Sequence, residues 1–170
     1  MDVATAGMLT RYKQWSNRLM FEAVAALPEG EAVKTRATLF KNMVHTLNHN
    51  YVIDRIWQAH LEGREHGYEA RNTKDHPPLE ELARLQDEVD DWYVGWADAQ
   101  SAATLAEVVH YTLVGGNQGS MTRGEILLHL AMHTNYHRGF VSDMIYGVAG
   151  HRPPTMDLPV YMREGVAPKA

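Results

Sequence analysis

The sequence of 170 residues contains no cysteine. Without a thiol, the chain can form no disulfide, use no cysteine nucleophile, and build no cysteine-type zinc site or iron–sulfur cluster. Any transition metal must therefore be held by imidazole and oxygen ligands. Histidine, in contrast, occurs ten times. Because cysteine is absent and histidine is abundant, the sequence directs attention to imidazole chemistry.

Long apolar runs are also missing. No segment approaches the roughly 20 apolar residues that a membrane-spanning helix needs. Charged residues recur through the first thirty positions, from Arg11 to Glu29, so they leave no room for the apolar core of a signal peptide. We therefore expect a cytoplasmic protein that does not associate with a membrane.

Positive charge is scarce. Sixteen Lys and Arg residues face twenty-one Asp and Glu residues, for a formal net charge of -5. A nucleic-acid-binding domain normally carries a basic face, so we expect no nucleic-acid partner. Hydrophobic residues make up 45% of the chain and charged residues 22%, a balance typical of globular proteins. The length suits one domain over residues 1–170.

Apolar residues recur at intervals of three and four in four long segments, which predicts four helices. They cover residues 3–27, 35–63, 79–99 and 122–148. Thr35 or Thr38 is the candidate N-cap of the second helix, and Gly63 its stop. The fold class predicted is all-α, a four-helix bundle whose two long connectors argue against a simple up-down-up-down order.

The connectors differ in character. Residues 64–78 form a polar connector, whereas residues 101–122 combine a short β-prone run with the turn sequence Gly115-Gly116-Asn117. This second pattern predicts a small hairpin before the last helix. The proline-containing tail, residues 151–170, is expected to lie across the bundle.

The last predicted helix carries two histidines in its apolar seam. The seam runs through Ile126, Leu130, His133, His137, Val141, Met144 and Val148. Imidazoles four residues apart lie one helical turn from each other and can reach a single ion. The pair lacks the glutamate of an H-E-x-x-H motif, and the chain lacks the paired Glu-x-x-His motifs of a di-iron bundle. Two core or rim histidines without a metal therefore remain a plausible alternative.

A third imidazole would strengthen the metal hypothesis. The second predicted helix offers His45, His49 and His60. One of them, together with the pair at 133 and 137, would leave two or three coordination positions open. Open positions are what a Lewis-acid or water-activating site requires.

Two segments resemble a known family. His49-Asn-Tyr-Val-Ile-Asp54-Arg55-Ile-Trp57 and His129-Leu-Ala-Met-His133-Thr-Asn-Tyr-His137-Arg138-Gly are similar to the helix-two and helix-four signatures of the DinB-like (damage-inducible) metal-binding bundles. The resemblance implies a down-up-up-down bundle, a divalent metal held by His49, His133 and His137, and a homodimer. The chain departs from many members at Phe140, where they carry glutamine.

Other polar residues receive secondary roles. His129, Tyr136 and Arg138 are candidates for supporting a ligand or contacting a substrate. Tyr136 and Arg138 flank His137 and could reach an anionic substrate near the metal. Asp54 and Arg55 are expected to form an ion pair on the helix surface. The acidic stretch from Glu80 to Asp91 is expected to be a solvated helix face.

Three neutral imidazoles would leave zinc, nickel or iron with its full charge, and that charge would activate a bound water or thiol. The resemblance favours a low-molecular-weight thiol, because some members are thiol S-transferases or isomerases. The leading hypothesis is thus a metal-dependent, S-transferase-like enzyme acting on a small molecule. A metal-dependent hydrolase is an alternative, although no glutamate stands out as its base. A non-catalytic stress-response sensor, whose metal would have a closed shell of four ligands, is another.

Overall fold

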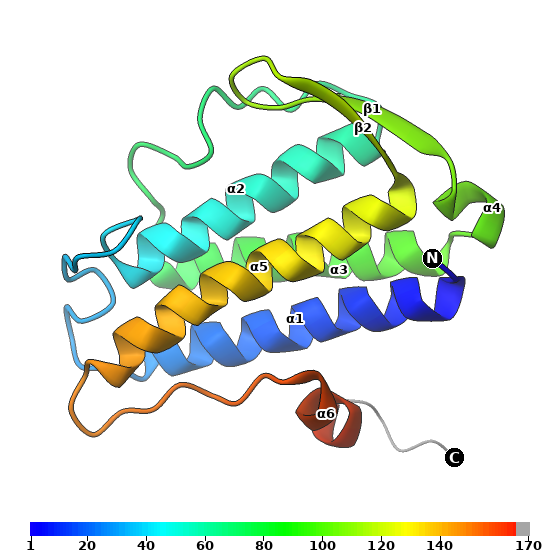
Figure 1. The fold of residues 1–170 in the computed structure, drawn as a ribbon. Coiled ribbons are helices and arrows are strands. Elements are labelled where there is room, and N and C mark those ends of the chain that lie inside the picture. The colour runs from blue at the N-terminus through cyan, green and yellow to red at the C-terminus, as the bar shows by residue number, and fades with distance from the viewer. Residues whose placement is uncertain (166–170) are drawn as a thin grey trace.

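The computed structural model describes residues 1–165, and its main feature is a bundle of four long helices. They are α1 (Val3–Ala25), α2 (Met43–Leu61), α3 (Leu79–Asp98) and α5 (Arg123–Tyr146). α1 packs against α3 and α5, and α2 packs against α5 and α3. The chain runs along α2 and α3 in one direction and along α1 and α5 in the other (Figure 1). In residues 1–165, no helix is long and apolar enough to cross a bilayer.

The predicted start of the second helix was wrong. α2 begins at Met43, and the Asn42 side chain caps it by accepting a hydrogen bond from the backbone N–H of His45 at 2.7 Å. Neither Thr35 nor Thr38 is the N-cap. Lys41 has a φ of 65°, in the left-handed region that a continuing right-handed helix does not use. Residues 26–42 therefore form a turn-rich loop.

The hairpin before the last helix is confirmed. β1 (Val108–Thr112) pairs antiparallel with β2 (Gln118–Thr122), so a two-stranded sheet accompanies the helical bundle. The unpredicted short helix α4 (Ala102–Leu105) precedes it. Thr122 ends β2 and also caps α5 through a capping box with Glu125. The hairpin thereby fixes where α5 begins and which of its residues face the bundle.

The tail lies against α1. It contains α6 (Leu158–Val160) and a π-helical turn, η1 (Tyr161–Gly165). Tyr161 is buried, with its ring centroid 5.6 Å from that of Tyr12 and 5.4 Å from that of Trp15. Residues 166–170 of the predicted tail lie outside the described residues.

Two apolar clusters form the core, and a polar layer lies between them. Along α1, Ala6 belongs to one cluster and Met20 to the other, while the buried residues between them include Thr10, Lys13 and Asn17. The same change occurs along α5, between Leu130 in one cluster and Val141 in the other. The middle of the bundle is therefore polar, and this is the level at which the histidines of α5 lie.

Charged side chains fill that layer. The Lys13 ammonium lies 2.6 Å from Asp54 Oδ2 and also contacts Asp90, and all three side chains are almost fully buried. Gln86 Nε2 donates to Asp54 Oδ2 at 2.7 Å, and Asn17 Nδ2 donates to Asp90 Oδ2 at 2.8 Å. The predicted surface ion pair of Asp54 was wrong, and Asp90 is not part of a solvated face.

Candidate metal centre

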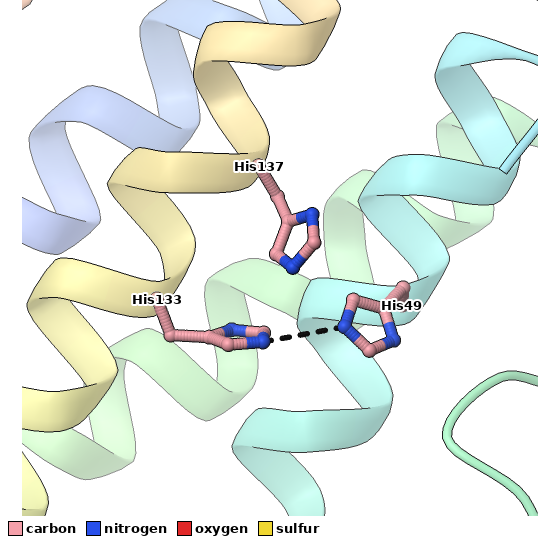
Figure 2. Close-up of side chains that lie close together, drawn as sticks. All are labelled: His49, His133 and His137. Atoms are coloured by element: carbon pink, nitrogen blue, oxygen red, sulfur yellow. Dashed lines mark hydrogen bonds between the residues drawn. The ribbon is translucent and has the colours of Figure 1, made fainter. Parts of the chain in front are cut away.

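Three histidines from two packed helices converge on one point. His49 comes from α2, and His133 and His137 lie one turn apart on α5 (Figure 2). Each offers a ring nitrogen that lies within 4.8 Å of those offered by the other two. The His137 ring centroid is 4.6 Å from those of both His49 and His133. These are the three residues that the family resemblance singled out.

The spacing of the nitrogens suits a shared ion. His49 Nε2 and His133 Nε2 are 3.2 Å apart. Two nitrogens bound to one tetrahedral zinc at 2.0–2.1 Å lie about 3.3 Å apart. His49 and His133 therefore already stand close to the separation that coordination would impose, and the nitrogen of His137 lies within 4.8 Å of both.

The tautomer of His49 is suited to ligation. Its Nδ1 lies 2.6 Å from the backbone carbonyl oxygen of Arg71. Because a carbonyl oxygen only accepts, Nδ1 carries the proton and the Nε2 lone pair faces the other two rings. A hydrogen bond of this kind on the far nitrogen is typical of metal-binding histidines.

The electrostatics keep the imidazoles neutral. Burial lowers the pKa of His133 to about 3, with further contributions from His137 and His49. Burial and the neighbouring His49 lower the pKa of His137 to about 4. Burial also lowers the pKa of His49, against the opposing effect of its hydrogen bond to Arg71. Neutral rings have the free lone pair that a metal needs.

Aromatic rings surround this group. Phe40, from the loop before α2, stacks on His49 with 4.4 Å between ring centroids and lies 5.5 Å from His137. Tyr136 and Phe140 lie 5.0 and 5.9 Å from His137. His49 and His137 are only 4% and 5% exposed. Phe40 was not expected here, because the sequence pattern placed it in a helix.

The other histidines of the two helices do not join the group. The His129 ring lies 5.5 Å from that of His133 and 5.3 Å from that of Trp57. His45 lies beside Phe40 and His76 instead. Within residues 1–165, the metal-competent group consists of three imidazoles, with no carboxylate among them.

The two remaining candidates, Tyr136 and Arg138, point to different environments. Tyr136 is 62% exposed and borders the group at His137. Arg138 is fully buried, and its Nη1 donates to Asn17 Oδ1 of α1 at 2.8 Å. Its guanidinium thus belongs to the polar layer of the core. The structure does not bring it to the exposed face of α5 where Tyr136 lies.

Comparison with known proteins agrees with the two sequence signatures. The chain is 22% identical over 160 residues to "Protein DinB" of Bacillus subtilis (strain 168), and the match covers 91% of each chain. The sequence model of the DinB family matches residues 1–169. The chain therefore belongs to the DinB family.

Proposed function

We propose that this DinB-family protein is a metal-dependent enzyme that activates a low-molecular-weight thiol, in a reaction similar to that of a thiol S-transferase. His49, His133 and His137 would be the ligands of a zinc, nickel or iron ion. The observation that carries the proposal is the convergence of three neutral imidazoles, two of them buried and His133 partly buried, whose ring nitrogens lie within 4.8 Å of one another. A divalent ion bound there would lower the pKa of a thiol or water in its open positions.

The protein's own residues would prepare the site. The Arg71 carbonyl holds the His49 ring in one tautomer and orientation. The helical spacing of His133 and His137 fixes the other two rings on one face of α5. Phe40 stacks on His49 and would shield it from water. A substrate would have to enter where His133 is still partly exposed, because His49 and His137 are almost inaccessible.

The surroundings favour a thiol over water as the activated group. A metal-dependent hydrolase normally places a carboxylate base beside the metal. Among residues 1–165, no carboxylate belongs to the imidazole group, and the rings that border it are Phe40, Tyr136 and Phe140. Aromatic rings suit the carbon skeleton and soft sulfur of a thiol better than they suit proton transfer.

The test is a reaction screen on protein loaded separately with zinc, nickel or iron. We expect thiol-dependent consumption of an electrophilic acceptor, lost in His133→Ala and kept in His110→Ala, whose imidazole is exposed on β1. Ester or amide cleavage without thiol dependence would indicate a hydrolase. Stoichiometric metal with no turnover of either kind would indicate a non-catalytic, stress-response metal protein. Either result would refute the thiol proposal.

We also propose a homodimer in the cytoplasm, by analogy with the family. Sedimentation velocity of the full chain tests the first point, and a sedimenting species with the 19.2 kDa mass of one chain would contradict it.

A further inference from the structure

A second feature lies away from the candidate metal centre. A cavity of about 700 Å³ opens between the C-terminal end of α2, residues 63–69 and β1. Its volume falls in the range of small-molecule sites. His60, which lines it, is eleven residues beyond His49, or about 16 Å along the helix. The cavity is therefore separate from the imidazole group.

Aromatic side chains form a continuous wall of this cavity. The ring of Tyr111 lies 6.0 Å from that of His60, which lies 5.5 Å from that of His66. The His66 ring in turn stacks with Tyr68 at 6.3 Å. The backbone N–H of Tyr68 donates to His66 Nδ1 at 2.9 Å and holds that ring in place.

The position of Tyr111 depends on a glycine in the opposite strand. Gly119 pairs with Tyr111 in the hairpin register. A Cβ at position 119 would lie 2.5 Å from the Tyr111 hydroxyl oxygen and 2.6 Å from its Cζ. The absence of a side chain at Gly119 thus lets the Tyr111 ring fold across β2 and rest on Trp57, at 4.8 Å between centroids.

The polar groups of the cavity favour positive charge in a ligand. Its charged lining residues are Arg64, Glu65 and Glu69. Arg64 is already paired with Glu62, at 2.5 Å, so the two glutamates leave an excess of negative charge. His60 Nε2 is buried without a hydrogen-bond partner. Burial lowers the pKa of His60, with a further contribution from His66, so this ring adds no positive charge near pH 7.

We propose that this cavity is a binding site for an organic ammonium ion. Aromatic faces attract quaternary and protonated amines through cation–π interaction, and the attraction strengthens where the cation loses water. Tyr68 and Tyr111 supply the rings, and Glu65 and Glu69 supply the compensating charge. A neutral ligand of the same shape would lack the electrostatic part of this attraction.

The experiment compares choline with its neutral isostere 3,3-dimethylbutan-1-ol, by calorimetric titration of the full chain. We expect saturable binding of one choline and binding of the isostere weaker by about tenfold or more. Glu65→Gln combined with Glu69→Gln should weaken choline binding and reduce its dependence on salt. Equal affinity for the two probes, or no saturation by about 10 mM choline, would overturn the proposal.

Variants of the hairpin locate the site. Tyr111→Leu and Gly119→Ala should each weaken choline binding about fivefold or more, because each removes the ring from the wall. Tyr111→Phe keeps the ring and should bind choline as the wild type does. Tyr146→Leu, which removes an exposed tyrosine on α5, is the matched control. Circular dichroism identifies any variant that fails to fold. If Gly119→Ala does not fold, the affinity of Tyr111→Leu decides the question. Unchanged affinity in folded Tyr111→Leu would contradict the assignment.

Discussion

Replacing Lys13 with methionine should cost a large part of the protein's stability. Lys13 is 2% exposed, and it lies against Asp54 and Asp90, which are 0% and 1% exposed. Methionine has a similar length and fills the same space, so the cavity cost is small. The substitution removes a buried cation and leaves two carboxylates facing each other. Breaking a buried ion pair in this way costs about 3–5 kcal/mol, against a total of about 5–15 kcal/mol for a domain.

The remaining partners cannot replace the lost charge. Gln86 donates amide hydrogen bonds to both carboxylates, and Asn17 donates one to Asp90. A hydrogen bond to a charged group contributes about 1.5–3 kcal/mol, but the wild type already has these bonds. The pKa of Asp54 is already raised by burial to about 6, against the attraction of Lys13. Without Lys13 this pKa rises further, and the folded protein takes up a proton that the unfolded chain does not. The stability that Lys13→Met loses relative to the wild type should therefore become smaller as the pH falls from 7.5 to 5.5.

Urea unfolding followed by circular dichroism measures both effects. We expect Lys13→Met to lose about 3–5 kcal/mol at pH 7.5 and less at pH 5.5. Arg84→Met is the control, because Arg84 pairs with Glu88 on the surface, with both side chains about 60% exposed, and should change stability by less than about 0.5 kcal/mol. A loss in Lys13→Met below about 1 kcal/mol, or one that grows on acidification, would refute the account of the polar layer.

Two further predictions concern the imidazole group. Because the pKa values of His133 and His137 lie near 3 and 4, protons compete weakly, and Co²⁺ affinity measured by absorbance should stay nearly constant from pH 7.5 to 5.5. With three imidazoles of ordinary pKa, the Co²⁺ affinity would fall about 1,000-fold over that range. A fall in Co²⁺ affinity above about 100-fold would therefore contradict the neutral-ligand assignment. Phe40→Ala should speed metal removal by a chelator several-fold, because the ring covers His49. Leu39→Ala, at an exposed neighbouring position, should leave the rate unchanged, and equal rates in both variants would show that Phe40 is not a cover.

Apolar periodicity predicted the four helices and the turn residues predicted the hairpin, because both signals are local. The same signal failed at residues 35–42, where Leu39 and Phe40 extend the apolar pattern of α2. Asn42 is the N-cap, but in the sequence Thr35 and Thr38 are equally suitable cap residues and come earlier. The contact of Phe40 with His49 depends on the fold of the loop, which no local pattern in the sequence indicates.

The site was predictable in part. Helical spacing alone paired His133 with His137, but residue chemistry left His45, His49 and His60 open as the third ligand. The family signature favoured His49, and the structure brings that residue to the pair. The buried ion network was missed because charged residues normally mark the surface. One signal was present: Lys13 continues the three-four spacing of buried residues that runs through Met20 and Val24.

Metal content tests the central claim most directly. The full chain is loaded with Zn²⁺ and dialysed, and the zinc that stays bound per chain is measured by elemental mass spectrometry. The variants His49→Ala and His133→Ala and the surface control His110→Ala are treated in the same way. The account predicts one tightly bound ion per chain in the wild type and in His110→Ala, and loss of that ion in the other two variants with their folds intact. Stoichiometric zinc retained by both His49→Ala and His133→Ala would contradict it.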